Sequence, residues 1–517
     1  MPEGTPGPAS ATAADAVLVR EFCDARWESE VLPLVERHIR IPAVSPAYDP
    51  DWEAGGHLDR AVDAAADWLR TVPLPGLHVE VLRAPGRTPL IFFEASGTAP
   101  GASSDAGFDP DAGPDSSAGP DPVTDVGSAP AVLFYGHLDK QPEGDGWTGG
   151  RTAWEPSFDG TRLYGRGGAD DGYALPAAVT ALRALAEQGA ARPRCVGVFE
   201  AGEESGSPDL DHWFGQLAPR TGEVGLVVCL DSGAGDYERL WLVTSLRGAC
   251  GGTLDVRVLG DGAHSGDAGG VVPSSFRVVR RLLDRLEDSA TGALRPAALT
   301  CEIPESRRAQ TREAARLLGA GVRGRYDWYE DTTPVTADPE ELLLNRAWRP
   351  SLEITGADGL PPAASAGNVL RPHTRVKLSL RLPPAVDGAA AVAEIGRLLE
   401  ADPPYGASVV FTPDRVLADG WQAPAELPWL SEALSAASRA CFDGADVARI
   451  GQGGTIPLMG KLSRQFPQAQ FLACGVLGPA ANAHGPNESL HVPYARRLTA
   501  SLSLTLNAYA LHGGQGV

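Results

Sequence analysis

The chain is 517 residues long and carries 44 lysines and arginines against 66 aspartates and glutamates, a formal net charge of −22 at pH 7. This acidic balance argues against nucleic acid or an anionic membrane surface as the main partner. Hydrophobic residues make up 43% of the chain, enough for cores of ordinary size, and the length predicts about two to four domains.

The start of the chain has neither a basic segment nor an apolar core of the kind found in secretory signals. No stretch approaches the roughly 18 continuous apolar residues of a membrane span. The seven cysteines are scattered and form no CxxC pair, which is typical of buried, reduced thiols. We therefore expect a cytoplasmic protein without a membrane partner.

The first part of the chain alternates between low-complexity and periodic segments. We expect residues 1–14 to form a disordered tail. Two stretches with helical periodicity follow, and then two strand-like runs, HVEVLR and PLIFFEA. Residues 98–130 are almost entirely Gly, Ala, Ser, Pro and Asp. Because such a segment cannot bury enough apolar surface to offset its ordering entropy, we expect a flexible surface insertion.

Beyond residue 130, continuous apolar strands alternate with helices. The pattern predicts strands at 131–136, 195–201, 226–231 and 471–476, a helix at 174–188 and a closing helix at 491–513. Strands without polar alternation are typical of a sheet that is buried on both faces. The predicted fold is therefore α/β, with a mostly parallel central sheet flanked by helices.

A segment with a different pattern lies between these strands. It predicts strands at 252–260, 375–382 and 407–413 and helices at 274–289 and 389–401. This β-α-β-α-β order, with alternating strands, favours a small α+β domain in which helices cover one sheet face. We expect an inserted domain at 246–412 that divides the main domain into residues 15–245 and 413–517.

Polar, potentially metal-binding side chains follow the apolar strands of the main domain. In chain order they are His137-x-Asp139, Asp170-Asp171, Glu203-Glu204, Asp231 and His484. In open α/β sheets, ligands bind outside the carboxyl ends of the strands, so these side chains are expected to converge. Histidines and carboxylates without cysteine ligands suit a divalent ion, Zn²⁺ first and Mn²⁺ as the alternative.

The number of ligands favours two ions. One histidine and two carboxylates per ion, with one carboxylate shared, require a set that the chain supplies in His137, Asp170, Glu204, Asp231 and His484. Two such ions would share a hydroxide and polarise a carbonyl group. Glu203 is left over beside a ligand and is predicted to act as general base and then general acid. Asp139 is predicted to orient the imidazole of His137.

With these residues identified, the chain resembles metallopeptidase family 20, and within it the carnosinase-like, cytosolic non-specific dipeptidases. The matching stretches are GHLDKQPEGDGW (136–147), LYGRGGADDG (163–172), FEAGEESGS (199–207), LDSG (230–233), SLRG (245–248), AHSG (263–266), SLRL (379–382), GGTIP (453–457) and AHGPNESL (483–490). The resemblance implies a zinc-peptidase-like catalytic domain and an inserted, ferredoxin-like lid domain that also forms a homodimer.

The resemblance also implies roles for individual residues. Asp170 would bridge the two metals, with His137 and Asp231 on one and Glu204 and His484 on the other, and the Asp170–Asp171 peptide bond would be cis. His264 would reach the partner subunit's active site and help to stabilise the oxyanion. The residues implied to bind substrate are Arg381, for the carboxylate, together with Asn368, Gly453, Gly454 and Thr455.

The chain departs from the family pattern at a few positions. Gly172 and Tyr173 stand where Lys-Gly is usual, and Asn368 stands where Thr is common. None of these is a predicted metal ligand, so the departures bear on substrate preference and not on hydrolysis.

The predicted function is hydrolysis of the amide bond of dipeptides or short peptides. An N-acyl amino acid deacylase would use the same metals and base with a different pocket. A catalytically silent relative that serves as a binding or scaffold protein is the alternative from another class. Because Glu203 and all five predicted ligands are present, the enzyme hypotheses are favoured.

Overall fold

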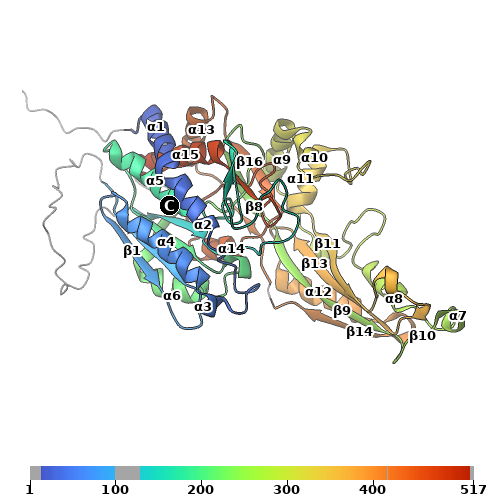
Figure 1. The fold of residues 1–517 in the computed structure, drawn as a ribbon. Helices are drawn as coiled ribbons and strands as arrows, with labels where there is room; N and C mark the ends of the chain where they lie inside the picture. Colours follow the sequence, from blue (N-terminus) through green and yellow to red (C-terminus); the bar gives the residue numbers. More distant parts are fainter. Residues whose placement is uncertain (1–12, 99–128, 416, 513–517) are drawn as a thin grey trace, which may run out of the picture. The chain divides into compact units, whose positions relative to one another are not determined.

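The computed structural model describes residues 13–98, 129–415 and 417–512 (Figure 1). The predicted tail at 1–14 and the predicted insertion at 98–130 lie almost wholly outside these residues. The chain divides into two compact units. The first unit comprises Met1–Val243, Pro424–Ala448 and Ser463–Val517, and the second unit comprises Thr244–Ala423 and Arg449–Leu462.

The first unit is built on a six-stranded sheet with the order β1-β2-β6-β3-β7-β17. Its strands are β1 (Leu77–Leu82), β2 (Leu90–Ala95), β3 (Ala131–His137), β6 (Cys195–Glu200), β7 (Val224–Cys229) and β17 (Gln470–Ala473). The pairs β6–β3, β3–β7 and β7–β17 are parallel, whereas β1–β2 and β2–β6 are antiparallel. Every residue of β3, β6 and β7 is buried, as their continuous apolar sequences predict.

Helices surround this sheet (Figure 1). They are α1 (Ala16–Arg26), α2 (Leu32–Ile39), α3 (Trp52–Gly55), α4 (His57–Thr71), α5 (Ala174–Glu187), α6 (Leu210–Thr221), α13 (Pro428–Cys441) and α15 (Val492–His512). A five-residue π-helical turn at Trp27–Val31 joins α1 to α2. Helix α5 packs on β3 and on α15, and it is buried along nearly its whole length. The predicted, mostly parallel α/β fold is confirmed.

A small antiparallel sheet joins two loops of the first unit that are distant in the sequence. Its order is β18-β5-β4, with β4 at Ser157–Phe158, β5 at Arg162–Tyr164 and β18 at Ser489–His491. Pairing of β5 with β18 places the segment after Tyr164 beside the segment before Ser489. These two segments carry Asp170 and His484.

The second unit contains a four-stranded antiparallel sheet with the order β11-β13-β9-β14. The strands are β9 (Gly248–Arg257), β11 (Ser351–Asp358), β13 (His373–Leu382) and β14 (Ser408–Pro413). Helices α8 (Ser275–Leu283) and α12 (Gly388–Glu400) pack against it. The order β-α-β-β-α-β, with the first and third strands in the centre, is the ferredoxin-like arrangement. The α+β prediction is confirmed.

Strand β11 was not predicted, because most of it is exposed and its sequence SLEITGAD shows little apolar alternation. Helix α8 ends at Leu283, several residues before the predicted end at 289. Three helices between the second and third predicted elements were also not predicted, namely α9 (Glu305–Leu318), α10 (Gly321–Gly324) and α11 (Pro339–Trp348).

The remaining elements are short. Strand β10 (Ala263–His264), which continues into helix α7 (Ser265–Ala268), pairs with β12 (Val369–Leu370). A three-stranded sheet has the order β15-β8-β16, with β8 at Trp241–Leu246, β15 at Trp421–Gln422 and β16 at Ala448–Gln452. The division between the units falls within β8, β16 and helix α14 (Pro457–Gln465). Among the described residues, no helix combines the length and apolarity needed to cross a bilayer.

Candidate metal centre

Three neighbouring parallel strands deliver polar residues to one edge of the sheet. His137 is the last residue of β3, Glu203 and Glu204 form a short 3₁₀ turn after β6, and Asp231 follows β7. Since β6, β3 and β7 are adjacent and parallel, the residues after their carboxyl ends lie together. The predicted convergence is therefore observed for these strands.

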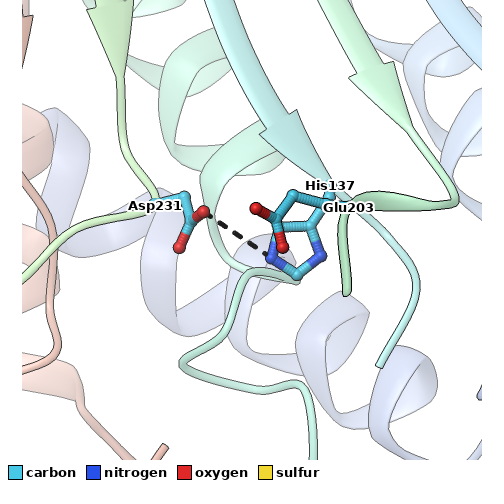
Figure 2. A group of neighbouring side chains, drawn as sticks. All are labelled: His137, Glu203 and Asp231. Atoms are coloured by element: carbon cyan, nitrogen blue, oxygen red, sulfur yellow. Dashed lines mark ion pairs between the residues drawn. The ribbon is translucent and has the colours of Figure 1, made fainter. Parts of the chain in front are cut away.

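The first group of side chains consists of His137, Glu203 and Asp231, shown in Figure 2. One potential ligand atom from each lies within 4.8 Å of the others. The Nε2 atom of His137 is 3.9 Å from an Asp231 carboxylate oxygen, the contact drawn in Figure 2. Three potential ligand atoms at this spacing could hold a metal ion.

The second group consists of Asp170, Glu204 and His484, again with one potential ligand atom of each within 4.8 Å of the others. The Nε2 atom of His484 is 3.1 Å from Asp170 Oδ2 and 3.4 Å from Glu204 Oε2. The other oxygen of Asp170, Oδ1, is 3.2 Å from Nε2 of His137. Asp170 thus faces both groups. The peptide bond between Asp170 and Asp171 is cis, as the resemblance implied.

Asp139 holds the turn that carries the two glutamates. Its carboxylate accepts hydrogen bonds from the backbone N–H of Glu203 (3.1 Å) and of Glu204 (3.0 Å). The same carboxylate lies 3.5 Å from Nδ1 of His137. The Nδ1 atom of His137 is also 3.1 Å from the backbone carbonyl of Asp139. Asp139 therefore lies beside His137, and it also positions the Glu203-Glu204 turn, a contact that the sequence pattern did not indicate.

The site concentrates buried negative charge. Burial, followed by the nearby Asp231, raises the pKa of Glu203 well above its usual range. Burial, followed by the charge of Asp170, raises the pKa of Glu204 to about 8. Burial raises the pKa of Asp231 to about 6. Burial also acts to raise the pKa of Asp170, but hydrogen bonds from His137 and His484 outweigh it and lower that pKa.

Buried carboxylates that face one another are costly unless a cation neutralises them. The donor set of imidazole nitrogens and carboxylate oxygens suits divalent ions such as Zn²⁺ or Mn²⁺. Asp170 has one oxygen directed at each histidine, the position that a carboxylate shared by two ions would occupy. The residues present therefore fit a pair of metal ions.

Sequence reasoning did not identify the residues that hold the Asp170 loop. The carboxylate of Glu488 is fully buried and accepts hydrogen bonds from the backbone N–H of Gly167 (3.0 Å), Ala169 (3.2 Å) and Asp170 (3.2 Å). The guanidinium of Arg166 donates to the same carboxylate at 2.8 Å. Sequence gives no signal for this, because 322 residues separate the paired side chains.

Gln141 was also not predicted. Its side-chain amide donates a 2.6 Å hydrogen bond to Oε2 of Glu204. This bond fixes the orientation of a carboxylate that belongs to the second group.

The departures at Gly172 and Tyr173 have local structural reasons. A Cβ atom on Gly172 would lie 2.3 Å from Cδ2 of His38, so only glycine fits there. The buried Tyr173 hydroxyl donates to the carbonyl of Leu230 at 2.5 Å, directly before Asp231 in the chain. Both departures thus support loops that carry residues of the two groups.

The predicted substrate-binding residues all lie in the second unit. Arg381, on β13, donates from Nη1 to the hydroxyl of Thr455 at 2.9 Å. That hydroxyl donates to the carbonyl of Arg247 at 2.6 Å. Gly453 and Gly454 precede Thr455, and no atom lies within 4 Å of a Cβ built on Gly454. Arg381 and the Gly453–Thr455 segment are therefore in contact.

His264 and Asn368 are brought together in the β10–β12 ribbon. His264 pairs with Val369, and the carbonyl of Asn368 accepts a hydrogen bond from the N–H of Ser265 at 3.0 Å. The His264 side chain is exposed and its Nδ1 accepts from the N–H of Gly266. The catalytic role of His264 stays a prediction.

Known proteins are similar to this chain over most of its length. The Peptidase family M20/M25/M40 matches residues 133–508. A cysteinylglycine-S-conjugate dipeptidase of Corynebacterium striatum is 28% identical over 378 residues, which cover 71% of this chain and 78% of the relative. A Beta-Ala-His dipeptidase of Mus musculus is 30% identical over 288 residues, which cover 53% of this chain and only 55% of the mouse protein.

Solved structures share the whole fold. The dipeptidase Dug1p from Saccharomyces cerevisiae superimposes with a TM-score of 0.73 at 21% identity, covering 96% of this chain and 99% of that one. Human carnosine dipeptidase 1 superimposes with a TM-score of 0.71 at 20% identity, covering 96% of this chain and 100% of that one. At these identities the likeness concerns the fold. The match over residues 133–508, far more than half of the chain, identifies this protein as a member of the Peptidase family M20/M25/M40.

Proposed function

We propose that this protein is a metal-dependent dipeptidase, which hydrolyses the amide bond of dipeptides or short peptides. The observation that carries the proposal is the position of Asp170. One of its carboxylate oxygens faces His137 in the first group of potential ligands, and the other faces His484 in the second. Family membership supports hydrolysis of a peptide bond, and the names of the similar proteins from Corynebacterium striatum and mouse support dipeptides as the substrate class.

The proposed ligands divide between two ions. His137 and Asp231 would bind one ion, Glu204 and His484 the other, and Asp170 both. Zn²⁺ is proposed as the native metal and Mn²⁺ as the alternative, since both accept nitrogen and carboxylate oxygen ligands. When bound, such a pair supplies Lewis acidity toward an attacking water and toward the substrate carbonyl. A structure of another family member is described as a dinuclear metal-binding peptidase, which supports two ions here.

Glu203 is proposed as the general base and then the general acid. Its carboxylate lies beside His137 and Asp231 but is not needed as a ligand in the two-ion scheme. It would take a proton from the attacking water and pass it to the amine that leaves when the C–N bond breaks. Asp139 would keep Glu203 in place through the Glu203 N–H, so we propose a positioning role for it.

The second unit is proposed to bind the substrate's carboxylate end. Arg381 would form a bidentate pair with the C-terminal carboxylate. The backbone of Gly453, Gly454 and Thr455 would contact the same end. Asn368 would contact the substrate as well. His264 would come from the partner subunit of a homodimer formed through the second unit and would help to stabilise the oxyanion.

We propose a cytoplasmic location. All seven cysteines are free, which supports a reducing compartment.

A hydrolysis panel tests the function. The protein is loaded with Zn²⁺ or Mn²⁺ and assayed against neutral dipeptides, acidic dipeptides and N-acetyl and N-succinyl amino acids, with chelator-treated protein as the control. We expect metal-dependent cleavage of dipeptides and much slower cleavage of the N-acyl compounds. Faster cleavage of N-acyl amino acids would identify a deacylase, and inactivity of the metal-loaded protein across the panel would favour a silent scaffold.

A further inference from the structure

Three arginines gather around one loop of the second unit. Arg247 follows β8, Arg346 lies in α11 and Arg381 lies in β13. Arg381 donates to Thr455, whose hydroxyl in turn donates to the carbonyl of Arg247. A Cβ atom on Gly453 would lie 3.0 Å from Nη2 of Arg247 and 2.9 Å from the carbonyl of Arg346. The Gly453–Thr455 loop therefore contacts all three arginines.

These guanidinium groups have no acidic partner within the described part of the chain. The groups that shift their pKa values are other arginines and Tyr326, in addition to the effect of burial. The Nε atoms of Arg247 and Arg346 are buried and lack a hydrogen-bond partner among the described residues. Arg349, in contrast, is only three residues beyond Arg346 and donates to Glu341 at 2.6 Å. An acidic partner is thus available in this region, yet it pairs with Arg349.

Arg247 and Arg346 differ in how they are held. Nη1 of Arg247 donates to the carbonyls of Asn345 and Arg349 at the end of α11 and to the hydroxyl of Ser351, so this arginine also caps a helix. Arg346 has the Tyr326 hydroxyl as its side-chain partner. Of these two arginines, Arg346 is therefore the one whose charge can be changed with less effect on the backbone.

Gathering like charges in a partly desolvated place is unfavourable. Burial and the neighbouring arginines lower the pKa of Arg247 to about 10, and burial and Arg325 lower the pKa of Arg346 to about 10. Such a cluster is stabilised when an anion binds to it. Under the proposed function, Arg381 takes the substrate's C-terminal carboxylate, which leaves the charge of the other two arginines without a partner.

We propose that Arg346 and Arg247 bind a second carboxylate of the substrate, so that the preferred substrates are dipeptides with an acidic C-terminal residue. The inference rests on the proposed function. It distinguishes this chain from the two similar dipeptidases whose names give glycine or histidine as the second residue. A guanidinium suits this task because its planar donors match a carboxylate and it stays charged at neutral pH.

The test compares Ala-Glu with its uncharged isostere Ala-Gln. For the wild-type, metal-loaded protein we expect kcat/KM for Ala-Glu to exceed that for Ala-Gln about tenfold to hundredfold, the range expected when one charge-assisted hydrogen bond is gained. The Arg346→Gln variant should lose most of this ratio. Arg316→Gln, which removes an exposed charge from α9 of the same unit, is the matched control and should keep the wild-type ratio.

Two results would overturn the inference while leaving the proposed dipeptidase intact: dipeptide cleavage without a preference for Ala-Glu, or a preference that Arg346→Gln does not reduce. If no dipeptide is cleaved, the proposed function fails. Binding of a carboxylate by Arg346 and Arg247 is then tested by protection against thermal unfolding. Stronger protection by glutarate than by its monoamide, lost in Arg346→Gln, would support the anion site, and equal protection by the two compounds would reject it.

Discussion

Two adjacent glutamates occupy different environments although they share a turn. The N–H groups of Glu203 and Glu204 donate to opposite oxygens of the Asp139 carboxylate. Glu204 also accepts from Gln141 and faces His484, whereas Glu203 faces His137 and Asp231. The different surroundings are the basis for assigning one residue as a ligand and the other as a base.

The Glu203→Gln variant tests that assignment. The amide cannot accept the proton from water, so kcat should fall by about 10²- to 10⁴-fold, while the metal content per chain stays at the wild-type value. Steady-state kinetics and elemental analysis measure the two quantities. Glu204→Gln is the control, because loss of a ligand should lower the metal content. Loss of metal from Glu203→Gln would show that Glu203 is a ligand and not the base.

At the scale of single residues, the sequence predicts those that directly follow strands. His137, Glu203 and Asp231 could be assigned because each lies at the end of an apolar strand or shortly after it, so their mutual proximity follows from sheet topology. Glu488 could not be assigned in this way. It lies in a loop, where an acidic side chain is normally solvated, and its burial depends on Arg166, 322 residues away.

At the scale of elements, the buried Arg166–Glu488 pair connects loops that carry proposed ligands. Arg166 donates to the carbonyls of Pro142, Glu143 and Gly485 as well as to Glu488. These carbonyls belong to the segments that follow His137 and His484 in the chain. The pair thus fixes three loops relative to one another.

The Glu488→Gln variant should reveal the strength of this connection. It leaves a buried guanidinium without its counter-charge, which typically costs about 3–5 kcal/mol. Urea unfolding should therefore show a correspondingly lower free energy of unfolding. The control is Glu394→Gln, which breaks an exposed pair with Arg397 on α12 and should have little effect. Equal stability of the two variants would contradict the proposed role of the buried pair.

Whether strands β13 and β11 could be predicted from the sequence depended on how buried and exposed residues alternate along them. Strand β13 alternates buried and partly exposed residues along its whole length and was found from sequence. Strand β11 lies at the edge of the same sheet, and six of its eight residues are exposed, so the alternation that marks a strand is missing. Its absence from the prediction left the inserted domain one strand short.

At the scale of the molecule, sequence order did not predict which segments pack together. Residues Arg449–Leu462 belong to the second unit although the chain on both sides of them belongs to the first. Hydrophobic periodicity reports that a segment is buried, but not against which partner it packs. The loop with Gly453 and Thr455 was therefore assigned through the family resemblance and not through its pattern.

Glu200 predicts a pH dependence for the stability of the whole molecule. It is buried and accepts hydrogen bonds from Tyr135 and Ser207, both at 2.7 Å. Burial raises its pKa from 4.5 to about 7. Because its pKa is raised in the folded state, Glu200 in its protonated form contributes to the stability of the fold. This contribution is full below pH 4.5 and is lost as the pH rises through about 7.

Titration of Glu200 should lower the free energy of unfolding by at most about 3 kcal/mol over this pH range. Urea unfolding at several pH values measures it, and the decrease should be smaller in Glu200→Gln, which has no titratable group at this position. An identical pH profile for the variant and the wild-type protein would show that Glu200 does not titrate in this range.

The proposed two-ion centre is tested most directly by anomalous X-ray diffraction from crystals of the protein loaded with Zn²⁺ or Mn²⁺. We expect two peaks about 3.5–4 Å apart. Asp170 should lie between them, His137 and Asp231 should bind one ion, and Glu204 and His484 should bind the other. A single peak, or peaks away from these five side chains, would contradict the proposed centre.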